Sequence, residues 1–196
     1  MEIYANGNKL DITLENEKNV GDLFKSFEQE CENNDATTVG IVVDGKNITA
    51  EEFDSVSMQE LSAVEKIEFS VISQSDILAE FNDESKECDE LSSQLTELSA
   101  KLQSGKDRES NVLISALAAF LDKFCHTVTV SSLFPEKFGT MKINGASIKE
   151  FFSDFSQVLN DFEQAIEVKD TILMGDLAEY EISPRLSSIS EAIKEI

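Results

Sequence analysis

The chain has a single histidine, and its place beside a cysteine is the closest approach to a catalytic pair. His126 follows Cys125 directly. A cysteine nucleophile and its histidine base must face each other within hydrogen-bonding reach. Neighbouring positions of a helix point about 100° apart, so we expect a structural or exposed histidine instead. With one histidine and three dispersed cysteines, the sequence also lacks the ligand spacing of a zinc site.

The densest carboxylates lie near a predicted bend in the last helix. They are Asp170, Asp176, Glu179 and Glu181. Carboxylate oxygens bind divalent cations, so a metal-dependent enzyme is one hypothesis. Charge runs are also typical of solvated helix faces, with Asp170 as a helix cap, and this is the interpretation that we prefer. Since a glycine-rich phosphate loop is also missing, we predict no catalytic residue, no cofactor and no metal ligand.

Tyr180 and Arg185 lie on either side of Pro184 and suit a protein interface. Tyrosine and arginine are enriched at the residues that dominate binding energy. Two alternatives stay open at this point. The alternative for Tyr180 is a place in the core. The alternative for Arg185 is a local ion pair with Glu181 one helical turn earlier.

Phenylalanine is abundant, with 13 copies, and several lie in one predicted helix. Phe151, Phe152 and Phe155 cover more than one narrow stripe of that helix. They form either a thick core reached from two sides or an apolar groove or dimer surface, which an exposed Phe152 or Phe155 would indicate. The candidate partner-binding residues are therefore Phe152, Phe155, Asp176, Glu179, Tyr180 and Arg185.

The composition is that of a folded, acidic protein. Of 196 residues, 41% are hydrophobic, which is enough apolar surface for a core. The formal net charge is −23, and the acidic residues are spread along the chain. Because lysine and arginine form no basic stripe, we expect no nucleic-acid partner. The same charge disfavours anionic membrane surfaces.

The first residues of the sequence and the three cysteines indicate the cellular compartment. No secretory signal is visible, and the longest mainly apolar run, 112–120, is too short to span a bilayer. Cys31, Cys88 and Cys125 are an odd number, and each is predicted on an apolar helix face, as expected for buried thiols in a reducing compartment. We therefore expect a cytoplasmic protein that does not bind membranes.

The sequence of residues 1–73 predicts two strands, a helix, two further strands, a short helix and a last strand. Asn6-Gly7 and Asp44-Gly45 are hairpin turn signals between alternating runs. Apolar spacing predicts a helix over 20–32, a capping box begins a short helix at Thr49, and the last strand covers about 65–72. The apolar side chains expected to pin the short helix under the sheet are Phe53, Val56, Met58 and Leu61.

This order of elements resembles the ubiquitin-like β-grasp fold over residues 1–73. The resemblance implies a protein-binding sheet face more often than an enzyme. Ubiquitin and the sulfur-carrier members end in paired glycines whose carboxylate is activated. Here the last strand continues from Ser73 into a helix, and the chain ends Lys194-Glu195-Ile196. We therefore expect neither conjugation nor sulfur carriage.

Long amphipathic helices joined by short links are predicted after residue 73, which favours antiparallel neighbours in a bundle. One helix is expected from Ser73 or Ser75 to about Gln103, and Glu84 is the one misfit in its apolar stripe. A later helix begins with a strong capping box at Ser147.

The last helix is expected to begin at Asp170. Gly175 then permits a close helix approach, and Pro184 kinks or breaks the helix. The segments that look like the helical region of uncharacterised bacterial proteins are Phe134–Glu136, Gly145–Ser147 and Asp170–Leu186. This resemblance implies a bacterial origin and no known activity.

We therefore predict an α+β protein with a β-grasp (ubiquitin-like) domain over 1–73 followed by an antiparallel helical bundle over 74–196. The favoured function is that of a non-catalytic cytoplasmic adaptor or regulatory protein that binds another protein, with a homodimer through the helical bundle as one form. The alternatives are an acidic secretion or flagellar export chaperone, similar in composition only, and the metal-dependent enzyme.

Overall fold

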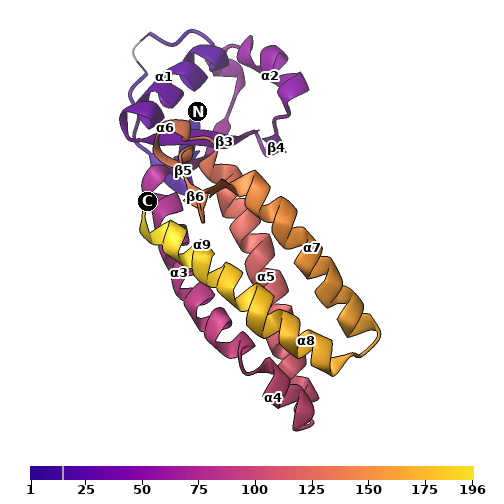
Figure 1. Ribbon diagram of the computed structural model, residues 1–196. Coiled ribbons are helices and arrows are strands. Elements are labelled where there is room, and N and C mark those ends of the chain that lie inside the picture. The colour runs from indigo at the N-terminus through magenta and orange to yellow at the C-terminus, as the bar shows by residue number, and fades with distance from the viewer. Residues whose placement is uncertain (15) are drawn as a thin grey trace. The chain divides into compact units, whose positions relative to one another are not determined.

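The computed structural model describes residues 1–14 and 16–196, which form two compact units. The N-terminal unit is Met1–Asp76, and the helical unit is Ile77–Ile196. The first contains a five-stranded mixed sheet, and the second is helical apart from a two-stranded hairpin (Figure 1). The predicted α+β class is confirmed.

The N-terminal unit places its first and last strands side by side in the middle of the sheet. Its elements are β1 (Glu2–Ala5), β2 (Asn8–Leu10), α1 (Val20–Asn33), β3 (Ala36–Val43), β4 (Lys46–Asn47), α2 (Ala50–Ser57), η1 (Leu61–Ala63) and β5 (Lys66–Ser73). The strand order is β2-β1-β5-β3-β4, with β1 and β5 parallel and the other neighbours antiparallel.

Both predicted hairpin turns are present, and each is tied to β5. Asn6 and Gly7 have φ values of 48° and 78°, and Asp44 and Gly45 have 48° and 81°, as tight hairpin turns require. The Asn6 amide accepts from the Val71 N–H and donates to the Val71 carbonyl, both at 2.9 Å. Asp44 accepts two backbone N–H groups at the start of β5. The turn residues thus fix the register of the sheet as well as the chain direction.

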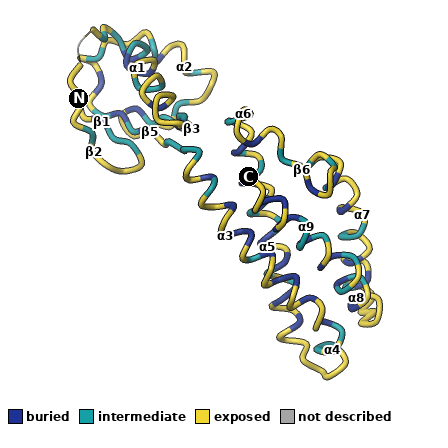
Figure 2. Tube along the Cα trace, turned by 60° about the vertical axis from the view of Figure 1, so that its left-hand side comes forward, coloured by how far each residue is buried: buried dark blue, intermediate teal, exposed yellow. Residues whose placement is uncertain are grey.

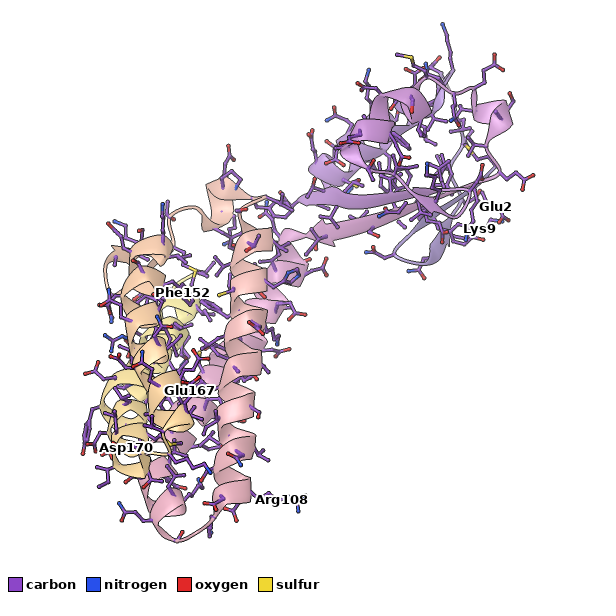
Figure 3. The ribbon with its side chains drawn as sticks, turned by 90° about the vertical axis from the view of Figure 1, so that its right-hand side faces the viewer. Glu2, Lys9, Arg108, Phe152, Glu167 and Asp170 are labelled. Atoms are coloured by element: carbon purple, nitrogen blue, oxygen red, sulfur yellow. The ribbon has the colours of Figure 1, made fainter. Side chains whose placement is uncertain are left out.

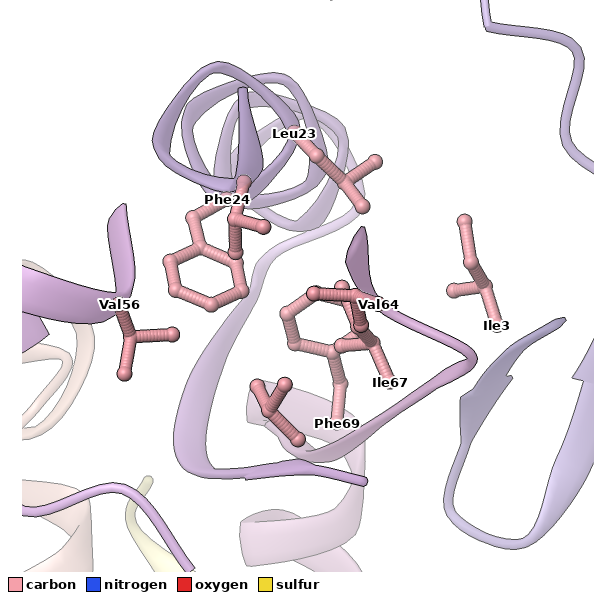
Figure 4. Packing of buried hydrophobic residues seen from close by; sticks show 9 residues of the cluster. Ile3, Leu23, Phe24, Val56, Val64, Ile67 and Phe69 are labelled. Atoms are coloured by element: carbon pink, nitrogen blue, oxygen red, sulfur yellow. The ribbon is translucent and has the colours of Figure 1, made fainter. Parts of the chain in front are cut away.

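Helix α1 covers one face of the sheet and forms the core with it. Figure 4 shows Leu23 and Phe24 of α1 above Ile67 and Phe69 of β5. Val20 and Ile67 are completely buried. Fully burying such side chains stabilises a fold by about 1.5–3 kcal/mol each, so this layer is the main support of the unit.

The outer edge of the sheet is only partly covered. The two-residue strand β4 pairs with Val42 and Val43 alone, so within the described residues the remainder of β3 has no second strand on that side. The register between β3 and β5 shifts at Val39, which forms a β-bulge and is 52% exposed. A bulge twists an edge away from regular pairing.

The helical unit is an antiparallel bundle. Its elements are α3 (Gln74–Leu95, whose first residues lie before the unit boundary), α4 (Leu98–Gln103), α5 (Asp107–Ser131), α6 (Pro135–Phe138), β6 (Lys142–Ile143), β7 (Ala146–Ser147), α7 (Ile148–Glu167), α8 (Thr171–Leu177), η2 (Ala178–Ile182) and α9 (Ser183–Lys194). Figures 1 and 2 show α3, α5, α7 and the α8–η2–α9 segment side by side, with buried positions recurring along them.

The single helix predicted to reach Gln103 is in fact two helices, because the chain turns at Thr96 and Glu97 between α3 and α4. Helix α4 packs against α8. A Cβ on Gly175 of α8 would lie 2.7 Å from the Ser99 Cβ of α4, which is too close for any side chain. The predicted close approach at Gly175 is confirmed, and its partner is α4.

Serine pairs join α3 to the last helix within the core. The hydroxyls of Ser85 and Ser190 are 3.0 Å apart, and those of Ser92 and Ser183 are 2.9 Å apart. All four side chains are buried. Small, mutually hydrogen-bonded side chains allow the two helices to approach without leaving polar groups unpaired.

Glu84, the misfit in the apolar stripe of α3, lies inside the bundle. It is completely buried, and its Oε1 accepts from the Thr127 hydroxyl of α5 at 2.6 Å, while its Oε2 has no hydrogen-bond partner among the described residues. Burial raises the pKa of this carboxyl, and the hydrogen bond from Thr127 opposes the rise.

By length and composition alone, the 25-residue helix α5 could cross a membrane. The shorter apolar run 112–120 within it, on which the sequence-based expectation rested, did not predict this. A core helix of a soluble protein passes the same test when it is mostly buried, whereas 28% of this stretch is buried. The apolar side chains that α5 buries in the bundle are Leu113, Leu117, Phe120 and Phe124.

Candidate functional site

The two phenylalanines among the predicted partner-binding residues belong largely to the core of the helical unit. Phe155 is completely buried, and its ring centre lies 5.8 Å from that of Phe151. Phe152, labelled on α7 in Figure 3, is half-buried, with its ring centre 5.9 Å from that of Phe124. The aromatic run of α7 is therefore a thick core, and Phe155 offers no surface to a partner.

Arg185 is engaged within the helical unit. Its guanidinium donates to the Glu181 carboxylate at 2.6 Å, to the Glu181 carbonyl at 3.0 Å and to the Asp154 carboxylate at 2.8 Å. Pro184 lacks an N–H group, and the helix widens just before it into the π-helical segment η2. The predicted pairing of Arg185 with Glu181 is confirmed, and the expected kink is a π-helical turn.

Tyr180 lies on the surface, not in the core. Its side chain is 65% exposed, Asp176 is exposed and Glu179 is half-buried. A hydrogen bond to the neighbouring Glu179 carboxylate raises the pKa of the Tyr180 phenol. Within residues 1–14 and 16–196, no three His, Cys, Asp or Glu side chains are grouped to hold a metal ion.

Three large apolar residues that precede this tyrosine in the sequence are also exposed. We call Val168, Ile172, Leu173 and Tyr180 the α8 corner, after the helix that Asp170 caps; Figure 3 labels Asp170. Asp170 accepts from the Leu173 N–H at 3.0 Å, which confirms the predicted cap. Exposed apolar side chains that gather in one patch are typical of an interaction surface.

A second surface, in the N-terminal unit, was not predicted from the sequence. A groove of about 890 Å³ lies between α1, α2 and the open part of β3. We call it the α1–α2 groove. Its apolar lining includes Phe24, Val39, Ile41, Ile48, Phe53 and Met58. Its volume is within the range of about 300–1,000 Å³ that is typical of ligand sites.

Two close approaches set the shape of the α1–α2 groove. Gly21 allows α2 to meet α1, because a Cβ there would lie 2.9 Å from the Ser57 Cβ. On the opposite side, the Glu28 carboxylate accepts from the Thr37 hydroxyl at 2.6 Å and from the Thr38 N–H at 3.1 Å. Helix α1 is thus fixed to both other walls, and the groove is held open by packing.

The groove exposes residues that we expected under the sheet. Val56 is buried as expected and Leu61 is half-buried, but Phe53 is 41% and Met58 is 81% exposed. The prediction for Met58 is wrong, because Met58 follows the last residue of α2 and its side chain lies outside the buried face of that helix. The signal in the sequence was the spacing, because Phe53 and Val56 are three residues apart, whereas Met58 is two residues beyond Val56 and does not share their helix face.

The cysteines show no sign of activation. Cys31 and Cys88 are buried as predicted, whereas Cys125 is exposed, as is His126, because this stretch of α5 faces outward. Burial raises the pKa of the Cys31 and Cys88 thiols, and partial desolvation together with the nearby Asp122 carboxylate raises the pKa of the more exposed Cys125. A thiol with a raised pKa is a poor nucleophile at neutral pH.

Comparison with known proteins gives matches along most of the chain. Residues 1–73 match the model of the TP0873 N-terminal domain. Residues 81–192 match the model described as a domain of unknown function, DUF8042. An uncharacterized protein of Treponema pallidum (strain Nichols) is 27% identical over 193 residues, which are 98% of this chain and 96% of that protein. No solved structure matches. Because the second model covers more than half of the chain, the protein belongs to the DUF8042 family.

Proposed function

We propose that this chain is a non-catalytic adaptor or regulatory protein of the cytoplasm and that its N-terminal unit, of β-grasp type, binds another protein through the α1–α2 groove. The observation that carries the proposal is the apolar rim of that groove. Val39, Phe53 and Met58 are all exposed beside it. Apolar side chains gathered at one concave site are typical of protein contacts.

The exposed apolar side chains at the groove set the binding free energy that a partner can gain there. Fully burying one large apolar side chain is worth about 1.5–3 kcal/mol. Phe53 is 41% and Met58 is 81% exposed, so together they offer about 2–4 kcal/mol to a partner that covers them. Association itself costs at least about 4 kcal/mol, so a stable complex needs contacts beyond these two side chains.

A homodimer through the helical unit is a second candidate, and the α8 corner favours it. Ile172 and Tyr180 are 68% and 65% exposed. A two-fold interface brings the same patch of both copies together, so an apolar patch on one protomer covers its own equivalent. Sedimentation of wild-type protein and of Ile172→Ser distinguishes a dimer at this corner from a monomer.

The proposed function is tested by affinity capture of the full chain from cells of its source organism. We expect a distinct set of proteins with the wild type and fewer of them with Phe53→Ser. Val112→Ser is the matched control, because Val112 is 65% exposed on α5 and does not line the groove. Identical sets from the wild type and Phe53→Ser would contradict the proposal.

A further inference from the structure

We propose that the α1–α2 groove recognises a short segment of another polypeptide in which an apolar anchor is flanked by lysine or arginine. This inference rests on the function proposed above and specifies the chemistry of the partner. The apolar wall of the groove receives the anchor, and carboxylates on the rim receive the basic side chains.

Aromatic rings line the part of the groove that would receive the apolar anchor. The ring centre of Phe24 lies 5.5 Å from that of Phe53 and 5.8 Å from that of Phe69. Phe24 and Phe69 are buried and form the floor, whereas Phe53 is partly exposed at the rim. An aromatic or large aliphatic side chain that enters the groove would meet this ring cluster and remove the Phe53 edge from water.

The rim of the groove is acidic. Asp22, Glu28 and Asp54 line it, and Lys25 is the only cation among the described lining residues. Asp54 makes no ion pair within the described part of the chain. Because the whole chain also carries a net charge of −23, an acidic partner would be repelled and a basic one attracted.

The edge of β3 favours recognition by side chains over addition of a regular strand. The Thr38 N–H, which a new strand would need, already donates to Glu28 at 3.1 Å. The bulge at Val39 interrupts the edge one residue later. These are devices that protect a sheet edge from unspecific pairing. Specificity therefore comes from the anchor and the flanking charges.

The test is selection from random peptides of about twelve residues displayed on phage, with the full chain as bait. The wild type and the control Val112→Ser should both enrich peptides with one large apolar residue next to lysine or arginine. Phe53→Ser should not enrich them. The double variant Asp22→Asn, Asp54→Lys should bind the enriched peptides about tenfold more weakly, because three units of favourable charge are lost at the half-buried Asp22 and the exposed Asp54.

Unfolding curves of each variant, and Asp54→Lys alone as a milder change, show whether a loss reflects the groove or the fold. Enriched peptides that depend on Phe53 but carry no excess of basic residues would overturn this inference and leave the proposed function standing. Failure to enrich any peptide that depends on Phe53 would also overturn it. The affinity capture described above then decides separately whether the groove binds a protein.

Discussion

In the helical unit Phe120, Phe124 and Phe155 are completely buried, whereas in the N-terminal unit Phe53 and Met58 remain exposed beside a groove. Both units contain aromatic clusters with most ring centres about 5.5–6.5 Å apart, and in the N-terminal unit those of Phe27 and Phe69 are stacked at 3.8 Å. The difference lies in how many elements cover each cluster. The aromatic face of α7 packs against its neighbours in the bundle, whereas the short helix α2 covers only part of the N-terminal core. The helical unit thus buries these aromatic rings, whereas the N-terminal unit leaves Phe53 and Met58 exposed beside the groove that we propose as a partner site.

The largest effect is expected where burial is complete. Phe155→Ala should lower the free energy of unfolding of the helical unit by about 3–5 kcal/mol, because the vacated volume lies in a closed core. Urea unfolding followed by circular dichroism measures it. Phe53→Ala is the matched comparison and should lose much less. Equal losses at the two positions would remove the contrast between the units.

A smaller effect is expected at the contact between α4 and α8. Gly175→Ala should destabilise the protein by about 1–3 kcal/mol, because the added Cβ collides with Ser99. The double variant Gly175→Ala, Ser99→Gly removes the colliding side chain and should recover part of the loss. Thermal unfolding of the three proteins provides the measurement. No recovery in the double variant would show that the strain lies elsewhere.

The buried carboxyl of Glu84 gives the helical unit a pH dependence. Burial raises its pKa above the ordinary value of 4.5, so the folded state binds the proton more tightly than the unfolded state does. Its contribution to stability is therefore greatest in acid and is lost as the pH rises from about 4.5 through the folded-state pKa. Lys123, which forms ion pairs with Glu80 and Glu87, moderates this effect.

Replacing Glu84 by glutamine removes the ionisable carboxyl and so isolates its contribution to the free energy of unfolding. The free energy of unfolding of Glu84→Gln should equal that of the wild type near pH 4.5. At neutral pH it should be higher by an amount on the order of 1 kcal/mol, because the variant buries a neutral amide in place of a charged carboxylate. Urea midpoints measured across this pH range test the sign. A difference between the two proteins that shrinks as the pH rises would contradict the buried carboxyl.

The smallest effect on stability is expected at the groove. Met58→Ser should change the free energy of unfolding by no more than about 0.5 kcal/mol, because this side chain is 81% exposed. The same variant should weaken partner binding, which affinity capture measures. Large destabilisation with unchanged binding would mean that Met58 serves the fold and not the groove.

Local signals in the sequence predicted much of the fold. The turns at Asn6-Gly7 and Asp44-Gly45 and the cap at Ser147 depend on a few neighbouring residues, and all three are present. The break at Thr96 and Glu97 was missed, because the apolar stripe of α3 continues into α4 and periodicity alone does not show a turn.

The candidate site was harder to predict, because exposure depends on contacts between distant elements. Tyr180 and Phe155 both fit an apolar stripe, yet one is exposed and the other is buried. The α1–α2 groove joins Asp22 to Val39 and Phe53, which no local pattern relates. Glu84 was visible as a misfit, and its burial follows from packing against α5.

Photo-crosslinking tests the central claim most directly. A photoreactive amino acid replaces either Met58, in the groove, or Val112, on the helical unit, in the full chain expressed in cells of its source organism. We predict a crosslink to another polypeptide from position 58 that is absent from position 112. No crosslink from position 58, or the same products from both positions, would contradict a partner-binding groove in the N-terminal unit.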